Sequence, residues 1–357
     1  MTSCRDSFNI DSLDEQAKLV VSCFPSEADT TWIEVTYSIP ISHGAYASNW
    51  DDYMEVRDAH IIYKVNGVER TIAWKDRIYN RWNEPVTHGR YYVTGPHQPG
   101  DHVELQVSAE GYESISAETT IPDAAPIVLK GIAETKVYDS YNEESRNVYQ
   151  LTATFTDPAA TTDYYAVRIR CKHYKAHAIG NLRPEYNDGS YEQHIQWPMV
   201  DENYYKDVID GWADIYDLHL QLDSIYTNPV ILTMSEPLLQ PLGELDGDFG
   251  YDNDYYQNFY IFNDTQINGQ TYTLHLNLSR YHDTQSDYNY LPVQYQVQLF
   301  HLVPEFYRYV KSINDLDNNE LAQGGFSLLS PTYTNVHNGI GIVGGYCMSQ
   351  SNWLTRE

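Results

Sequence analysis

Apolar and polar side chains alternate with the two-residue period of a β-strand through most of this chain. The alternation is clear in residues 32–39, 102–108 and 165–171, and the Asn-Gly pairs at 66–67 and 268–269 match tight turns between antiparallel strands. Because short turn signals separate these runs, and long helical patterns do not, we predict an all-β fold of antiparallel sheets.

Two prolines within the segment 122–126 interrupt the alternation and mark the predicted domain boundary. A chain of 357 residues is long enough for about two domains. Residues 17–122 hold about seven short strand signals, the spacing of an immunoglobulin-like β-sandwich, although the Cys–Trp–Cys core signature of antibody domains is missing. Residues 126–357 predict a larger antiparallel β-sandwich or partly closed barrel.

One segment, residues 304–314, has the period of a helix instead. Pro304 suits a first helical turn, and apolar residues follow at helical spacing. A helix of about three turns is not stable alone, so we expect this short helix to pack on a sheet. The apolar stripe consists of Phe306, Tyr309, Val310 and Ile313.

The first 16 residues read as a polar tether that begins Met-Thr-Ser-Cys. Two small residues before Cys4, and a polar stretch after it, look like the end of a bacterial lipoprotein signal, in which the cysteine becomes acylated. We therefore expect lipidation at Cys4, with acyl chains that supply ~0.8 kcal/mol of membrane affinity per buried CH₂. The alternative is an ordinary N-terminus with a chance cysteine.

The charge balance restricts the possible partners. With 22 basic and 50 acidic residues the formal net charge is −28, which argues against nucleic acid and against an anionic membrane surface. Membrane contact is therefore expected through the lipid anchor alone.

Tyrosine is the most unusual part of the composition, with 33 residues against 9 phenylalanines and 7 tryptophans. Tyrosine combines a large apolar area with a polar tip, which favours binding surfaces, for example a platform for a small ligand, glycan or peptide. The alternative is that tyrosine replaces phenylalanine on half-buried strands. The candidate ligand-binding residues are Trp212, Tyr251, Tyr255 and Tyr256.

The densest group of acidic residues lies in the same loop as these tyrosines. Its carboxylates offer the hard oxygen ligands that Ca²⁺ prefers, but the order of residues does not match an EF-hand loop. A solvated acidic loop is the favoured interpretation, with calcium as the alternative. The residues are Asp246, Asp248, Asp252 and Asp254.

Motifs for other cofactors fail on their context. Residues 339–344 spell G-x-G-x-x-G, but only 13 residues follow, too few for the βαβ unit of a dinucleotide fold. We expect a close backbone approach there instead. Cys171, His173 and His177 have a loose zinc-like spacing, but Cys171 already reads as a core residue of a strand. We predict no catalytic residues and no metal ligands beyond the calcium alternative.

Three segments of the C-terminal third, residues 262–272, 297–313 and 330–344, have a recognisable order. Together with Cys4 and the boundary near Pro122, they resemble the domain-of-unknown-function 4249 family, a set of Bacteroidetes-type exported lipoproteins. The resemblance implies an outer-membrane lipoprotein on the cell surface or the periplasmic face, often encoded beside a TonB-dependent transporter. It implies no known catalytic residues.

We therefore expect a non-enzymatic, lipid-anchored cell-envelope protein that captures a ligand for a TonB-dependent outer-membrane transporter. Two alternatives remain open from the sequence. One is an enzyme that acts on surface glycans or peptides, and the other is an adhesive or structural surface module.

Overall fold

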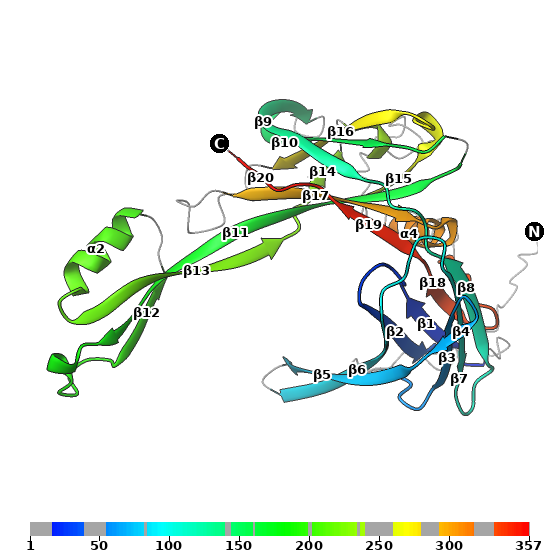
Figure 1. The fold of residues 1–357 in the computed structure, drawn as a ribbon, viewed down its shortest axis with the longest axis horizontal. Coiled ribbons are helices and arrows are strands. Elements are labelled where there is room, and N and C mark those ends of the chain that lie inside the picture. The colour runs from blue at the N-terminus through cyan, green and yellow to red at the C-terminus, as the bar shows by residue number, and fades with distance from the viewer. Residues whose placement is uncertain are drawn as a thin grey trace, which may run out of the picture.

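The computed structural model describes residues 16–38, 55–81, 84–139, 144–159, 161–198, 202–233, 236–239, 260–279, 293–317 and 332–356. Four β-sheets dominate these segments (Figure 1). The predicted all-β class with sandwich-like packing is therefore confirmed. No helix within the described ranges has the length and apolar character that crossing a membrane requires.

The first sandwich packs a five-stranded sheet, in the order β18-β1-β2-β6-β5, against a four-stranded sheet, in the order β4-β3-β7-β8. Alternate residues of both sheets point inward, and Ile33, Tyr63 and Leu105 are almost completely buried between them. The strands are β1 (Leu19–Cys23), β2 (Thr30–Tyr37), β3 (His60–Val65), β4 (Val68–Arg70), β5 (Ile72–Arg81), β6 (Glu84–Thr94), β7 (His102–Ser108), β8 (Ile115–Thr120) and β18 (Ile340–Val343).

Strand β18 comes from the far end of the chain, from the part that we had assigned to the second unit. It pairs in parallel with β1, and Val343 joins the first core. Gly341 has a φ of +115°, and a Cβ atom there would collide with the Val21 carbonyl oxygen. The glycine-rich segment therefore serves a close backbone approach, as predicted.

The second sandwich has its own core between the sheets β14-β16-β10-β9 and β12-β11-β17-β19. Phe155 and Tyr165 fill its centre. Its strands are β9 (Ile127–Asp139), β10 (Glu144–Thr156), β11 (Tyr164–Leu182), β14 (Ile231–Leu232), β15 (Tyr260–Asn263), β16 (Thr271–Ser279), β17 (Gln294–Leu302), β19 (Tyr346–Gln350) and β20 (Leu354–Thr355), with short 3₁₀ turns η2 (Pro184–Tyr186), η4 (Pro237–Leu239) and η5 (Asp264–Gln266).

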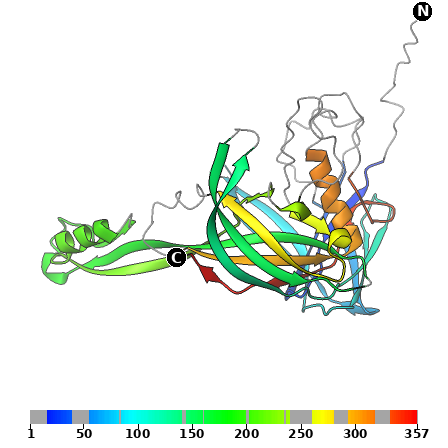
Figure 2. The same cartoon turned by 90° about the horizontal axis from the view of Figure 1, so that it is seen from above.

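Strand β11 is 19 residues long, and its outer half leaves the body of the molecule. There it pairs with β12 (His194–Pro198) and β13 (Tyr216–Thr227), and helix α2 (Glu202–Trp212) covers one face. These elements form a projecting arm, which Figures 1 and 2 show on the left. We call β12, β13, α2 and the outer half of β11 the arm.

Among the described residues, this part of the chain has two α-helices, where the sequence predicted one. Helix α4 (Pro304–Asp317) confirms the prediction, because Val310 packs against Leu302 and Ala166. Helix α2 was not predicted. Its sequence nevertheless carries the helical signal, because Tyr205, Val208, Ile209 and Trp212 stand at i, i+3, i+4 and i+7. Among its described side chains Val208 is the buried one, and it packs on the sheet of the arm.

Candidate functional site

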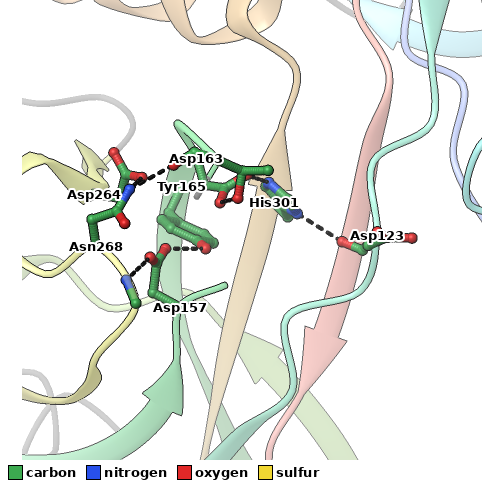
Figure 3. A network of polar contacts seen from close by, with 9 residues as sticks. Asp123, Asp157, Asp163, Tyr165, Asp264, Asn268 and His301 are labelled. Carbon is green, nitrogen blue, oxygen red and sulfur yellow. Dashed lines mark hydrogen bonds and ion pairs between the residues drawn. The ribbon is translucent and has the colours of Figure 1, made fainter. Parts of the chain in front are cut away.

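Three buried carboxylates meet at one end of the second sandwich (Figure 3). Asp157 follows β10, Asp163 precedes β11, and Asp264 begins the turn η5. Each is at most 7 % exposed, and one oxygen of each lies within 4.8 Å of the others. Charges this close in a buried place need compensation from hydrogen-bond donors, protons or a cation.

Asp157 is held by two donors. Tyr165 donates its hydroxyl to Oδ1 at 2.7 Å, and the Gly269 N–H donates to Oδ2 at 2.8 Å. Burial, and then the hydrogen bond to the Asp157 carboxylate, raise the pKa of Tyr165 far above its usual value. Tyr165 therefore keeps its proton and remains a donor.

The other two carboxylates bind side chains from neighbouring turns. Thr161 donates its hydroxyl to Asp163 Oδ2 at 2.6 Å, and Asn268 Nδ2 donates to Asp264 Oδ2 at 2.9 Å. The Asp264 N–H also donates to the Asp163 carbonyl oxygen at 3.1 Å. The network thus ties the β10–β11 turn to the β15–β16 turn.

His301 of β17 adds the only ring nitrogen that this network contains among the described residues. Its Nδ1 lies 2.7 Å from the Asp123 carbonyl oxygen, so Nδ1 carries a proton that it donates. Its Nε2 lies 3.0 Å from Asp163 Oδ1, which is also an acceptor when ionised. This second hydrogen bond requires one further proton, on His301 or on Asp163.

The position of Asp123 gives the network a second role. Asp123 lies between β8 and β9, in the segment that connects the two sandwiches. The bond from His301 therefore anchors the connecting segment to the second core, as the right side of Figure 3 shows.

The chemistry that the three carboxylates can support follows from their oxygen atoms. Carboxylate oxygens are ligands for a hard cation such as Ca²⁺, and this is the one such group of three or more metal-ligating residues within the described segments. Existing hydrogen bonds already use at least one oxygen of each carboxylate. Since all three residues are buried, they are placed to hold structure together and not to reach a large substrate.

Of the residues predicted from sequence, Trp212 is described. It ends helix α2 and is 37 % exposed at the tip of the arm. Its ring lies 5.5 Å from Trp197 and 5.9 Å from Tyr216, measured between centroids. The other predicted residues lie outside the described segments and stay predictions: Cys4, Tyr251, Tyr255, Tyr256, Asp246, Asp248, Asp252 and Asp254.

The arm also exposes aliphatic side chains that sequence analysis did not single out. Leu220 and Leu222 of β13 are 38 % and 47 % exposed, and both lie on the face that carries α2. Tyr226 continues this row. Contiguous apolar groups that are exposed to water on a protein surface mark contact sites for ligands or partners.

The loose zinc-like pattern has a structural explanation. Cys171 is buried in the second core, as predicted, and its Sγ contacts His173 Nε2 at 3.1 Å. His173 and His177 are four residues apart on one face of β11, which separates them by ~13 Å. They cannot ligate one metal ion together.

A polar hollow of about 670 Å³ lies over β7 and β8 of the first sandwich. His102 and Glu118 approach each other there, with 3.6 Å between Nε2 and Oε2. Both side chains are well exposed, so this hollow is part of the solvated surface.

The carboxylate network was missed by sequence reasoning, although some of its residues lie in segments quoted for the family resemblance. Asp264, Asn268 and His301 belong to those segments. The sequence did contain a signal for part of the network. The Asp157-Pro158 pair indicates a turn, and Asp163 stands directly before the next strand, so Asp157 and Asp163 lie at the two ends of one turn.

Comparison with known proteins supports the resemblance. The family model described as domain of unknown function (DUF4249) matches residues 5–351, nearly the whole chain. No curated protein matches the chain. The two-sandwich protein with a projecting arm described above therefore belongs to the DUF4249 family.

Proposed function

We propose that this chain is an exported, lipid-anchored cell-envelope protein that captures a ligand for a TonB-dependent outer-membrane transporter. In this proposal Cys4 carries the acyl chains, the outer membrane is the site of action, and the protein binds without catalysing a reaction.

The projecting arm is the observation that best supports a binding role. It reaches beyond the body of the molecule and carries Trp212 at the end of α2, and Leu220 and Leu222 on β13, all with exposed side chains. Contiguous exposed apolar groups mark sites of contact with partners or ligands, so their presence favours a contact surface.

The carboxylate network favours a non-enzymatic role. An enzyme that acts on glycans or peptides needs acidic groups within reach of its substrate. Asp157 and Asp264 are each 2 % exposed and are hydrogen-bonded to their own turns, which suits a structural task.

The binding role can be tested in native membranes. We expect the tagged protein to co-purify with a β-barrel transporter, and a Leu220→Ser and Leu222→Ser double variant to lose most of that recovery. Val128→Ser is the matched control, because Val128 is 46 % exposed on β9, away from the arm. Equal recovery with both variants, or recovery of no barrel, would contradict the proposal.

The proposed acyl anchor at Cys4 can be tested separately, in cells that produce the protein from its own gene. Labelling with a fatty-acid probe should mark the wild-type protein, and Cys4→Ser should abolish the label and release the protein from membranes. A label that survives in Cys4→Ser would show that the anchor is elsewhere.

A further inference from the structure

A row of cations on strand β11 suggests a second kind of recognition. Arg168, Arg170 and Lys172 stand at alternate positions of β11, so their side chains share one face of the sheet at intervals of ~6.6–6.8 Å. Their direct neighbours on β17 are three glutamines. The register pairs Arg168 with Gln298, Arg170 with Gln296 and Lys172 with Gln294.

The three cations contact neutral groups. The Arg168 guanidinium lies 5.0 Å from the Phe300 ring centroid, that of Arg170 lies 4.2 Å from Tyr226, and Lys172 Nζ lies 4.8 Å from Tyr174. Arg168 Nε also donates to Gln298 Oε1 at 2.8 Å. The rings hold the cations in place without neutralising them.

The lack of ion pairs along this row, within the part of the chain that the structure describes, is unusual for such an acidic chain. Within the described residues, none of the three cations forms an ion pair, although the chain has 50 acidic and only 22 basic residues. Cations on a protein surface are ordinarily interspersed with carboxylates. Cations without an ion pair among the described residues leave their charge available to an anionic partner.

The row lies between the two helices. Helix α4 covers the inner end of this face through Ala166 and Val310, and helix α2 covers the outer end through Ala178 and Val208. Between them Arg168 is exposed, and Arg170 and Lys172 are half-buried. Figure 1 shows β11 running from the body, where α4 lies, to the arm.

We propose that this face of β11 binds an extended acidic segment of a partner protein, with carboxylates at every second residue. In an extended chain, alternate side chains recur at the same ~6.6–6.8 Å interval, so successive carboxylates would meet Arg168, Arg170 and Lys172 in register. Arginine binds carboxylates with two parallel hydrogen bonds, and the flanking Leu222 and Tyr226 offer apolar contacts beside them.

This proposal goes beyond the proposed function, because it depends neither on the lipid anchor nor on a transporter. The net charge of −28 repels acidic chains in general, so binding of one such chain requires a local match to the cation row.

Binding of short labelled peptides to the whole soluble chain tests the match. We expect a peptide of alternating Glu and Thr to bind about tenfold more tightly than a peptide of the same composition with all Glu in one block. Added salt should weaken the binding, because the contacts are solvent-accessible charges.

Variants locate the site. Arg168→Gln with Arg170→Gln should lose about tenfold or more in affinity for the alternating peptide. The single change Lys172→Glu, at a half-buried position, should cause a loss of similar size. Lys130→Gln is the matched control, because Lys130 is exposed on β9 and should leave binding unchanged. Circular dichroism would confirm that each variant is folded.

Several outcomes would overturn the proposal: equal binding of the block and alternating peptides, unchanged affinity in both Arg168→Gln with Arg170→Gln and Lys172→Glu, or no binding of either peptide at low salt. Tighter binding of an oligomer of uronic acid than of the alternating peptide would also overturn it, and would assign the face to an acidic glycan.

Discussion

Among the described residues each sandwich buries one histidine, and the two histidines differ in the number of protons that their hydrogen bonds require. In the first sandwich, His97 Nδ1 lies 2.9 Å from the Ser26 carbonyl oxygen, and its Nε2 lies 2.7 Å from the Tyr63 hydroxyl. A neutral ring satisfies both contacts, since Tyr63 can donate to Nε2. In the second sandwich, His301 faces a carbonyl oxygen and a carboxylate, and making both hydrogen bonds takes one further proton, on His301 or on Asp163.

This difference shows two ways to stabilise a β-sandwich. The first core relies on apolar packing with a neutral polar link, and it should respond chiefly to lost volume. The second core contains carboxylates whose partners offset the cost of burial, and it should respond strongly when one partner is removed.

The largest expected effect is at the charged network. Asp163→Ala leaves His301 and Thr161 without their common acceptor, and we expect a loss of ~3–5 kcal/mol in the free energy of unfolding, measured by denaturant titration. Asp223→Ala is the control, because Asp223 is half-exposed and lies 3.9 Å from His177, so its loss should cost ~0–1 kcal/mol. Equal losses would remove the contrast between a buried network and a surface pair.

The next effect tests packing in the first sandwich. Ile33 is fully buried there, and Ile33→Val removes one methylene from the core. We expect a loss of ~0.5–1.5 kcal/mol in the free energy of unfolding. A negligible loss would mean that the first core is loosely packed around β2.

A smaller effect concerns acid. Burial lowers the pKa of His97 below its ordinary value of 6.5. The unfolded chain therefore binds a proton more readily than the folded chain, so stability is lost as the pH falls below 6.5. Replacing the ring by His97→Gln should flatten the fall in melting temperature between neutral pH and about pH 5.5. An unchanged slope would contradict this assignment.

The smallest expected effect concerns two buried cysteines, Cys23 and Cys347, which we expect not to react with an alkylating reagent while the protein is folded. Burial raises the pKa of Cys23 in the first sandwich, and raises that of Cys347 in the second to about 12. Since the thiolate is the reactive form, neither cysteine should be alkylated in the folded protein, whereas both should be after unfolding. Labelling of either one in the native state, detected by mass spectrometry, would show that its sheet opens.

Local patterns in the sequence were sufficient for the elements whose side chains follow one period. The alternation at 32–39 and 102–108 predicted β2 and β7, and the stripe that begins at Phe306 predicted α4. Helix α2 was missed although Tyr205, Val208, Ile209 and Trp212 have the same helical spacing, so its period was available in the sequence. Only the structure shows that it packs on the arm through Val208.

The sequence by itself determined the all-β class, the helix at Pro304 and the membership suggested by the C-terminal segments, because these depend on neighbouring residues. Only the tertiary structure decided that β18 completes the first sheet, that Asp157, Asp163, Asp264 and His301 meet, and that β11 continues into an arm. The physical reason is that strand pairing and the burial of charge join residues far apart in the chain, and no period within one segment records which distant partner it meets.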